Sequence, residues 1–233
     1  MTLIDSKNIP QIISDLESQI SLPPGFITLL ANEDDWSFVI KLHALMEAAI
    51  THLLSETLAT STKGYAEDTF QESSLSRIFA WMEMSNKRTG KIAIAEALGL
   101  ILEWQRKFVA KLSEIRNHVV HDVKNVSFSF PEYVKTLDSN QRQNLIDAFD
   151  YGVGTNDMIK SILKVDQPGS EFVLTNTKLA IWGSALLCLS EIAYCILAFK
   201  SQKRTIVMNE EMSKTLQQFL DAMKPFIQQK GAS

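Results

Sequence analysis

The sequence predicts an all-α protein: an antiparallel helical bundle with extra helices towards the C-terminus and one short extended segment. Apolar residues recur at helical spacing along most of the 233 residues. Glycine and proline, which interrupt helices, number only nine and six. We therefore expect a single helical domain over residues 1–233, with a core bundle over about residues 30–125 and a helical extension over about residues 138–230.

The first long helix is predicted over residues 33–59, after a short helix over residues 10–20 and a break at the LPPG sequence of residues 22–25. Asn32 is a candidate N-cap, and the acidic residues that follow it suit the positive end of the helix dipole. The apolar residues of one face are Phe38, Leu42, Leu45, Ala49 and Leu53. We expect this stripe to be buried in the core.

Shorter helices are expected to link this helix to the next long one. A polar loop over residues 61–69 precedes helices over about residues 74–87 and 89–98, and Gly99 either ends the second of them or kinks the chain. A helix over residues 102–121 follows. Its apolar stripe consists of Trp104, Phe108, Leu112, Ile115 and Val119, at steps of four, four, three and four.

The chain after this helix is predicted to be extended over a few residues. Residues 126–130 alternate apolar and polar side chains with a period of two, and Pro131 is expected to stop the run. This pattern gives either an extended segment laid over the bundle or one short edge strand. A short helix is expected over residues 139–151, followed by loops over residues 152–158 and 164–172.

Two further helices complete the predicted fold. Residues 178–199 are nearly long and apolar enough to span a membrane, but Glu191 lies well inside them, where a charge is costly in lipid. We therefore expect a buried core or dimer-interface helix and no membrane span. The last helix is predicted over residues 209–228, and we expect its apolar face to pack on the bundle or on a partner.

The composition favours a cytoplasmic protein, and the chain as a whole lacks the positive charge that is typical of nucleic-acid-binding proteins. The formal net charge is −4. Residues 84–124 nevertheless carry eight Lys or Arg and four Asp or Glu, a local excess of +4 that is compatible with binding a phosphate chain. No signal-peptide pattern opens the sequence, and Cys188 and Cys195 lie on one helix face, as free thiols of a reducing compartment.

Several side chains that are capable of catalysis or binding lie at the end of the 102–121 helix. The sequence there, over residues 112–122, is LSEIRNHVVHD. At about 100° per residue, Asn117 lies almost opposite the apolar stripe, and His121 is its i+4 neighbour. Val120 lies between Arg116 and His121. We therefore expect a second surface to cover this face, most simply that of a symmetric homodimer.

The pattern Arg116-Asn117-x-x-x-His121 resembles the R-x(4–6)-H signature of the HEPN superfamily, and residues 36–54 resemble the long first helix of these small bundles. The resemblance implies a dimeric, metal-independent ribonuclease of a toxin–antitoxin or other defence system, or a non-catalytic relative that binds RNA or nucleotides. Under it, Arg116, Asn117 and His121 are the catalytic residues, and no cofactor or metal is required.

The order of segments is similar to that of a second family, the mannitol operon repressor family. The similarity is carried by FVIKLHALMEAAITHLL, SSLSRIF, ALGLI, IRNHVVHD, FSFPEYV and a late apolar helix, in that order. It implies a non-catalytic transcriptional regulator that acts through protein–protein contacts. That family lacks the Arg–Asn–His signature, so the chain combines its layout with the residues of an active motif.

The motif suits cleavage of RNA by its own 2′-hydroxyl, which attacks the adjacent phosphate. His121 would move protons, because imidazole titrates near neutral pH, and Arg116 would hold and stabilise the charged phosphate. Asn117 would orient one of these side chains or bind substrate. Arg116 and His121 lie about 140° apart on an ideal helix, so they converge only if the helix end loosens or if two helices meet across a two-fold axis.

The same side chains have simpler roles open to them. His121 can cap its helix, and Arg116 can pair with a carboxylate across the bundle. Glu47 either bonds His43 on the helix surface or lies near the motif and orients Arg116. His118 either supports the motif or forms part of a metal site with His121 and Asp122. No further ligand is evident, so we expect no metal.

Three classes of function therefore remain open. The first is a HEPN-like ribonuclease, with RNA as substrate and an antitoxin as a protein partner. The second is a regulator that binds another protein, and the third is an accessory scaffold of a bacterial defence operon. The sequence contains no nucleophilic Ser or Cys motif, no dinucleotide-binding motif and no P-loop. The Arg–Asn–His motif favours the ribonuclease.

Overall fold

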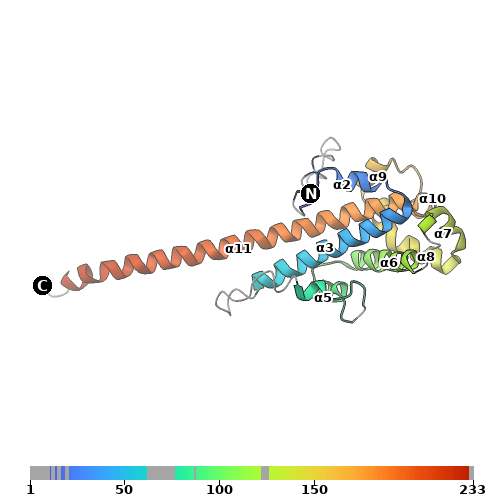
Figure 1. The fold of residues 1–233 in the computed structure, drawn as a ribbon. Coiled ribbons are helices and arrows are strands. Elements are labelled where there is room, and N and C mark those ends of the chain that lie inside the picture. The colour runs from blue at the N-terminus through green and yellow to red at the C-terminus, as the bar shows by residue number, and fades with distance from the viewer. Residues whose placement is uncertain are drawn as a thin grey trace.

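The computed structural model describes residues 21–61, 77–86, 88–121 and 126–230, together with residues 11, 14, 17 and 18. Across these ranges the protein is all-α and contains no strand, which confirms the predicted fold class. The helices are α2 (Phe26–Leu30), α3 (Asp35–Ser61), α5 (Lys91–Ala97), α6 (Glu103–Val120), α7 (Phe130–Thr136), α8 (Ser139–Asp150), the π-helical turn η3 (Tyr151–Thr155), α9 (Asp157–Leu163), α10 (Gly169–Thr175) and α11 (Thr177–Lys230) (Figure 1).

Helix α3 lies at the centre of the bundle, and α11 runs beside it in the same direction (Figure 1). Near the start of both helices, Lys178 Nζ lies 3.5 Å from Asp35 Oδ1. Further along both, Lys200 Nζ lies 3.9 Å from Glu56 Oε1. Helices α5 and α6 also pack against α3, while α8, η3 and α10 pack against one another and against α11.

The apolar surface of α3 is wider than the single stripe predicted for it. The buried residues of α3 include the whole predicted stripe and its neighbours: Phe38, Val39, Leu42, Leu45, Met46, Ala49, Ile50, Leu53 and Leu54. Helices α11, α5 and α6 all contact α3, so most of its circumference is removed from water. This central position also places His43, Glu47 and Glu56 of α3 beside polar groups of α6, α5 and α11.

Helix α3 begins at Asp35, two residues later than predicted, because Asp34 is its N-cap. The Ser37 N–H donates to Asp34 Oδ1 at 2.9 Å, and Ser37 Oγ donates to Asp34 Oδ2 at 2.5 Å. These bonds lower the pKa of Asp34. The proposal of Asn32 as the cap is therefore wrong. The polar loop predicted after α3 and the start of the helix predicted from residue 74 lie outside the described residues.

Gly99 ends α5 and turns the chain into α6. Its φ of +68° lies in the left-handed region that favours glycine. The Gly99 N–H donates to Glu96 O at 2.9 Å, and the Leu100 N–H donates to Ala95 O at 2.9 Å, which together form a Schellman motif. Of the two roles predicted for Gly99, the structure therefore confirms the helix end.

Helix α6 buries the predicted apolar stripe almost completely. Phe108, Leu112, Ile115 and Val119 are each at most 1% exposed. Trp104, at the start of the stripe, is half-buried, and its ring stacks on Tyr151 with centroids 4.4 Å apart. Since one face of α6 is fixed in the core, the motif near its end points away from that core.

The segment after α6 is extended over a shorter length than predicted. Ser129 has extended φ and ψ, but α7 begins at the next residue, Phe130, and Pro131 lies in its first turn. Proline is tolerated there because the first N–H groups of a helix have no partner within it. The Phe130 N–H instead donates to Asp35 Oδ2 at 2.8 Å. The extended run therefore ends beside Pro131, as predicted, but the helix that begins there was not predicted.

The two loops predicted between residues 152 and 172 are largely helical. The first forms the π-helical turn η3 and the start of α9, which Asn156 caps by accepting from the Ile159 N–H at 3.0 Å. The second contains the start of α10, after Pro168. Residues 164–168 remain a loop, as predicted, whereas Gly154 and Gly169 lie against Asp150 within helical segments.

Gly169→Ala is expected to destabilise the fold by about 2 kcal/mol, as overpacking of a filled site does. A Cβ at this position would overlap Asp150 Oδ1 and lie 2.7 Å from the Gly154 Cα. Urea unfolding of both forms measures the change in free energy. Ser170→Ala, at the adjacent exposed helical position, is the control and should stay within about 0.5 kcal/mol of the wild type; equal stability of Gly169→Ala would contradict the packing.

Helix α11 is one continuous helix of 54 residues, where the sequence predicted two. The residues between the two predicted helices, 200–208, read KSQKRTIVM and contain neither glycine nor proline. The cations near residue 200 mark no helix end in the structure, since Lys200 pairs with α3. At about 1.5 Å per residue the helix is about 80 Å long, and its C-terminal part projects beyond the end of α3 (Figure 1).

Two helical stretches are long and apolar enough to cross a membrane by length and composition, Asp35–Leu58 and Thr177–Gln202. Half of the first window and two thirds of the second are buried within the fold. Core helices of soluble proteins meet the same criterion, so the two stretches are weak evidence for a membrane.

Cys188 and Cys195 on α11 are free, and burial raises the pKa of both thiols.

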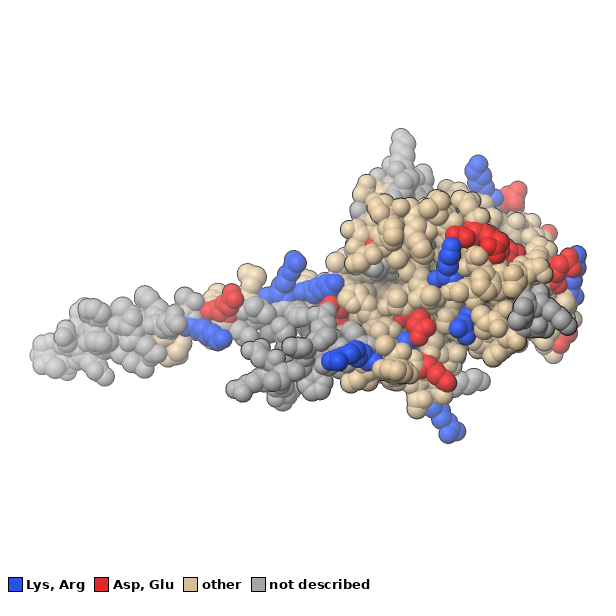
Figure 2. All heavy atoms as spheres, viewed as in Figure 1, with Lys and Arg blue, Asp and Glu red and all other residues tan. Residues whose placement is uncertain are grey.

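Charged side chains of both signs are mixed on the surface shown in Figure 2. Four of the eight cations of residues 84–124 form ion pairs. The pairs are Lys91 with Glu47, Arg106 with Glu96, Lys107 with Glu103 and Lys111 with Glu114, at N–O distances of 2.6 to 3.1 Å. Three of these carboxylates, those of Glu96, Glu103 and Glu114, are already counted in the local excess of +4, so only the pair with Glu47 reduces it.

Candidate functional site

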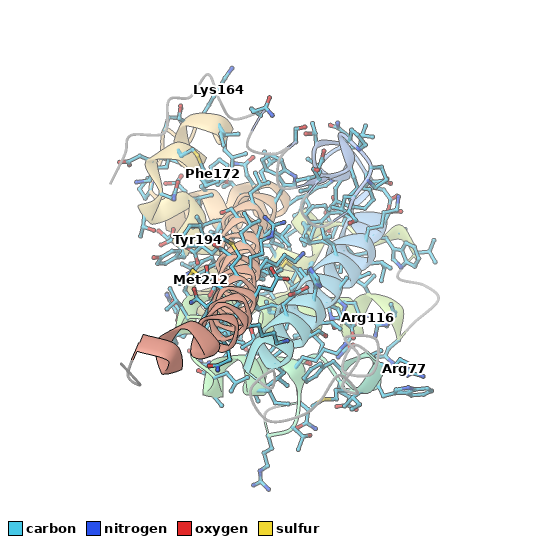
Figure 3. All side chains as sticks on the ribbon, turned by 90° about the vertical axis from the view of Figure 1, so that its left-hand side faces the viewer. Arg77, Arg116, Lys164, Phe172, Tyr194 and Met212 are labelled. Carbon is cyan, nitrogen blue, oxygen red and sulfur yellow. The ribbon has the colours of Figure 1, made fainter. Side chains whose placement is uncertain are left out.

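The end of α6 carries the motif on its solvent side. Helix α6 ends at Val120, and His121 follows as its C-cap with φ −77° and ψ −15°. Arg116 is half-buried, whereas Asn117 and His121 are exposed. Arg116 Nη1 donates to Asn117 Oδ1 at 3.1 Å, so the two motif residues are linked directly. Figure 3 shows Arg116 on the side of α3 that faces away from α11.

His43 of α3 lies close to Arg116. Its Nε2 lies 3.1 Å from Ser113 Oγ, one turn before Arg116 on α6. Burial lowers the pKa of His43; the carboxylate of Glu47 opposes this, and the positive charges of Arg116 and Lys91 lower the pKa further. The His43 imidazole therefore takes up a proton less readily than a free histidine does.

The lowered pKa of His43 predicts a fold that loses stability as the pH falls. The unfolded chain takes up this proton at about pH 6.5, whereas the folded chain resists it, so the unfolded state binds more protons below that pH. We expect the urea midpoint to fall between pH 7.5 and pH 5.5. His43→Gln, which cannot titrate, should show a smaller fall, and an equal fall in both proteins would contradict the assignment to His43.

Glu47 pairs with a buried lysine and does not bond His43. Lys91 Nζ lies 2.6 Å from Glu47 Oε1, and the Lys91 side chain is only 2% exposed against 35% for Glu47. Among the described side chains, no hydrogen bond joins Glu47 to His43. The surface bond predicted between them is therefore wrong, because each bonds a different neighbouring helix. An orienting role for Glu47 on Arg116 stays a prediction.

His118 faces α7 and not the rest of the motif. Its ring centroid lies 5.6 Å from that of Tyr133 and 6.3 Å from that of Phe128. Burial, together with the charge of Glu114, raises the pKa of Tyr133 to about 12. The His118 ring thus belongs to an aromatic cluster that holds α7 against the end of α6.

The structure does not bring Arg116 and His121 together within one chain. The His121 backbone N–H donates to Asn117 O at 3.2 Å, which closes the last turn of the helix. Across the described residues, no hydrogen bond or ion pair joins the side chains of Arg116 and His121. This agrees with their expected angular separation of about 140°. Val120 between them is 38% exposed.

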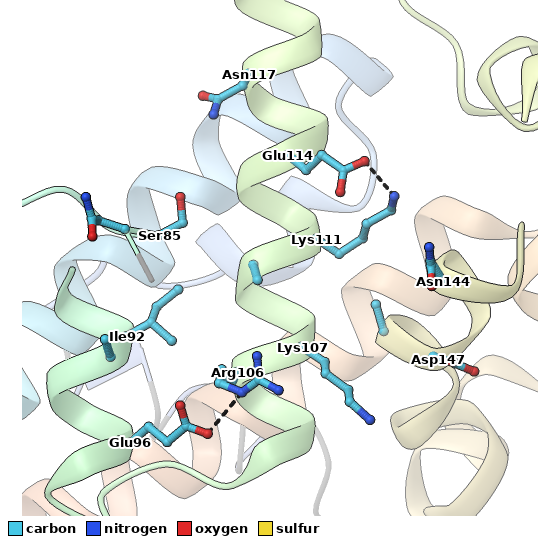
Figure 4. A pocket seen from close by; sticks show the side chains of 14 residues that line it. Ser85, Ile92, Glu96, Arg106, Lys107, Lys111, Glu114, Asn117, Asn144 and Asp147 are labelled. Atoms are coloured by element: carbon cyan, nitrogen blue, oxygen red, sulfur yellow. Dashed lines mark hydrogen bonds and ion pairs between the residues drawn. The ribbon is translucent and has the colours of Figure 1, made fainter. Parts of the chain in front are cut away.

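A groove of about 590 Å³ lies between α5, α6 and α8, with Asn117 at one end and Arg106 towards the other (Figure 4). This volume is in the range of small-molecule sites. Asn144 of α8 lines it opposite α6, so amide donors and acceptors face the groove from two helices. Lys107 and Lys111 add cationic groups along its length.

No three His, Cys, Asp or Glu side chains come together as a candidate metal site in the part of the chain that the structure describes. Asp122, which the sequence placed beside His118 and His121, lies outside the described residues. His118 is directed into the aromatic cluster around Tyr133, which leaves it poorly placed to share a ligand with His121.

Comparison with known proteins assigns the chain to no family. No family model matches the sequence, and no curated protein or solved structure is significantly similar to it. The geometry of the α6 end is therefore the basis for interpretation.

Two residues of this region were not among the predicted site residues, His43 and Lys91. Their positions in the sequence indicate in part that each side chain needs a partner. His43 lies in an apolar helix four residues before Glu47, and Lys91 begins the otherwise apolar run of α5. A polar residue in such a run needs a partner once it is buried. The sequence alone does not name that partner, because Ser113 and Glu47 belong to other helices.

Proposed function

We propose that the chain is a HEPN-like, metal-independent endoribonuclease of a toxin–antitoxin or other defence system. The observation that supports this best is the hydrogen-bonded pair of Arg116 and Asn117 at the open end of α6. Asn117 also lines a groove of nucleotide size, and His121 is exposed one turn further on. Arg116 would bind the phosphate and His121 would move protons.

The reaction is a transesterification that needs no co-reactant. The 2′-oxygen of the substrate attacks the adjacent phosphorus, and His121 accepts the 2′-hydroxyl proton. The P–O5′ bond breaks, and the proton is returned to the leaving 5′-oxygen. Arg116 stabilises the charge that develops on the phosphate oxygens, because its guanidinium group is planar and always protonated. The products carry a 2′,3′-cyclic phosphate and a 5′-hydroxyl.

We propose that Arg116 and His121 meet at one phosphate only when two copies of the chain associate. The exposed Val120 would lie at the centre of the contact between two α6 ends. His121 of one copy would then face the phosphate that Arg116 of the other copy holds. This homodimer, RNA and an antitoxin-like protein are the proposed partners, and the cytoplasm is the proposed location.

The proposal predicts cleavage of RNA in the presence of EDTA. Wild-type protein and His121→Ala are incubated with 5′-labelled RNA, and the ends of the fragments are analysed. We expect cleavage by the wild type that leaves cyclic-phosphate ends, and loss of cleavage in His121→Ala. His118→Ala is the matched control on the same helix, since its ring packs on Tyr133. Absence of cleavage by a folded wild-type protein would overturn the proposal.

A second candidate function is that of a non-catalytic regulator related to the mannitol operon repressor family. The ion pairs of Arg106, Lys107 and Lys111 favour it, because they leave less free positive charge for RNA. The exposed apolar side chains of α11, such as Tyr194, also favour protein–protein contacts. For this function, His121→Ala should leave regulation unchanged.

A further inference from the structure

A second hollow, the α6–α11 hollow, lies where the start of α6 meets α11. Its volume is about 450 Å³, which is in the range of small-molecule sites. The chain just before α6 supplies Leu100 and Leu102, the first turn of α6 supplies Gln105, and α11 supplies Glu191 and Tyr194. This hollow is separate from the groove that Asn117 lines.

The walls of the α6–α11 hollow are largely apolar and open to solvent. Leu102 is 57% exposed and Tyr194 is 75% exposed, while Leu100 is half-buried. Figure 3 shows Tyr194 on the side of α11 that faces away from α3. Removing apolar surface from water is favourable. A ligand with an apolar body would therefore gain free energy by covering these side chains.

The polar part of the hollow is a carboxylate that a buried amide holds in place. Gln105 Nε2 donates to Glu191 Oε2 at 3.0 Å. The Leu102 N–H donates to Gln105 Oε1 at 2.6 Å, which fixes the orientation of the amide and directs its NH₂ group to Glu191. Gln105 is only 2% exposed. The position of the Glu191 carboxylate is therefore set by contacts inside the fold.

Glu191 has no counter-ion within the described part of the chain. It is half-buried, and no ion pair joins it to a described Lys, Arg or His. Burial raises the pKa of the Glu191 carboxyl group, as expected of an acid in an apolar surround. A half-buried carboxylate gains more from a cation than a fully solvated one does, because water screens the pair less. The hollow is thus suited to a positively charged group.

The number of charged groups limits the kind of cation. Glu191 is the one charged residue among the described residues that line the hollow, and Cys195 lies beside it. Across the described ranges, no three His, Cys, Asp or Glu side chains come together, so a metal ion would lack further protein ligands here. A polyamine would leave charges unpaired against the apolar walls. A single positive charge on an apolar body matches the hollow best.

We propose that the α6–α11 hollow binds a small organic monocation, a primary amine with an apolar or aromatic body. The ammonium group would pair with Glu191, and the body would cover Leu100 and Leu102. Tyr194 lies one helical turn from Glu191, at i+3, so its ring can also contact the cation. This binding site goes beyond RNA cleavage and does not depend on Arg116 or His121.

Calorimetric titration of the full chain tests the site with two probes of the same shape. At pH 8, 2-phenylethylamine is protonated, as alkylamines are, whereas 2-phenylethanol is neutral. We expect the amine to bind at least about tenfold more tightly than the alcohol, since only the amine forms a charge-assisted hydrogen bond. Equal affinities would overturn the proposal, as would absence of amine binding at roughly 10 mM.

Glu191→Gln assigns the binding to the hollow. Glutamine keeps an oxygen that can accept from Gln105 Nε2, so the fold should be retained. We expect this variant to lose at least about tenfold in affinity for the amine and to bind the alcohol as the wild type does. Glu171→Gln, at an exposed position on α10, is the matched control and should change neither affinity. Wild-type affinity for the amine in Glu191→Gln would overturn the proposal.

Two further variants separate the contacts and the sites. Tyr194→Leu keeps an apolar wall but removes the ring, and it should weaken amine binding about two- to fivefold, as loss of an exposed cation–π contact does. Unchanged affinity in Tyr194→Leu would contradict the aromatic contact. His121→Ala should bind the amine as the wild type does, so failure of the ribonuclease proposal leaves this one standing.

Discussion

Glu47→Ala is expected to destabilise the protein by roughly 3 kcal/mol, because it leaves the ammonium group of Lys91 buried without its counter-ion. The Lys91 side chain is 2% exposed and lies 2.6 Å from Glu47 Oε1. Removing one partner of a buried pair costs far more than the net contribution of the pair itself. Chemical unfolding in urea at pH 7 measures the change.

The matched control removes both charges. In the double variant Glu47→Ala/Lys91→Met, an apolar side chain of similar length fills the space of the lysine, and most of the lost stability should return. If Glu47 acted on Arg116 alone, Glu47→Ala would alter activity with little loss of stability. A double variant no more stable than Glu47→Ala would contradict the ion-pair explanation.

Arg116→Ala is expected to lower the rate of RNA cleavage about 10²–10³-fold, the range found when one group that stabilises transition-state charge is removed. The loss should appear in kcat with little change in stability, since Arg116 is only half-buried and donates to the neighbouring Asn117. Single-turnover cleavage of labelled RNA measures the chemical step.

Arg116→Lys keeps the charge but not the planar fork, so it should recover only part of the activity. Full activity in Arg116→Lys would mean that charge alone is needed. Full activity in Arg116→Ala would remove Arg116 from the site altogether.

The fold was predictable where apolar residues recur at helical spacing along one helix. The stripe of α6 and the long helix α3 follow from the spacing of their apolar residues. The continuity of α11 did not follow, because the polar residues 200–205 after a long apolar run look like a helix end. The role of Pro131 was also missed, since the carboxylate that accepts from the Phe130 N–H belongs to Asp35, far away in the sequence.

The position of the candidate site was predictable, but its neighbours were not. Spacing alone places Asn117 on the solvent side of α6 and separates Arg116 from His121. The partners of His43 and Glu47 depend on how α3 packs against α5 and α6. Contacts between helices depend on crossing and register, which one sequence does not specify.

The claim that Arg116 and His121 act on the same phosphate is tested most directly by their double variant. Cleavage of one labelled RNA in EDTA is measured for the wild type, Arg116→Ala, His121→Ala and Arg116→Ala/His121→Ala. Residues that act as a unit are strongly non-additive, so the double variant should lose no more activity than the worse single variant. Losses that multiply, or single variants as active as the wild type, would contradict a shared catalytic site.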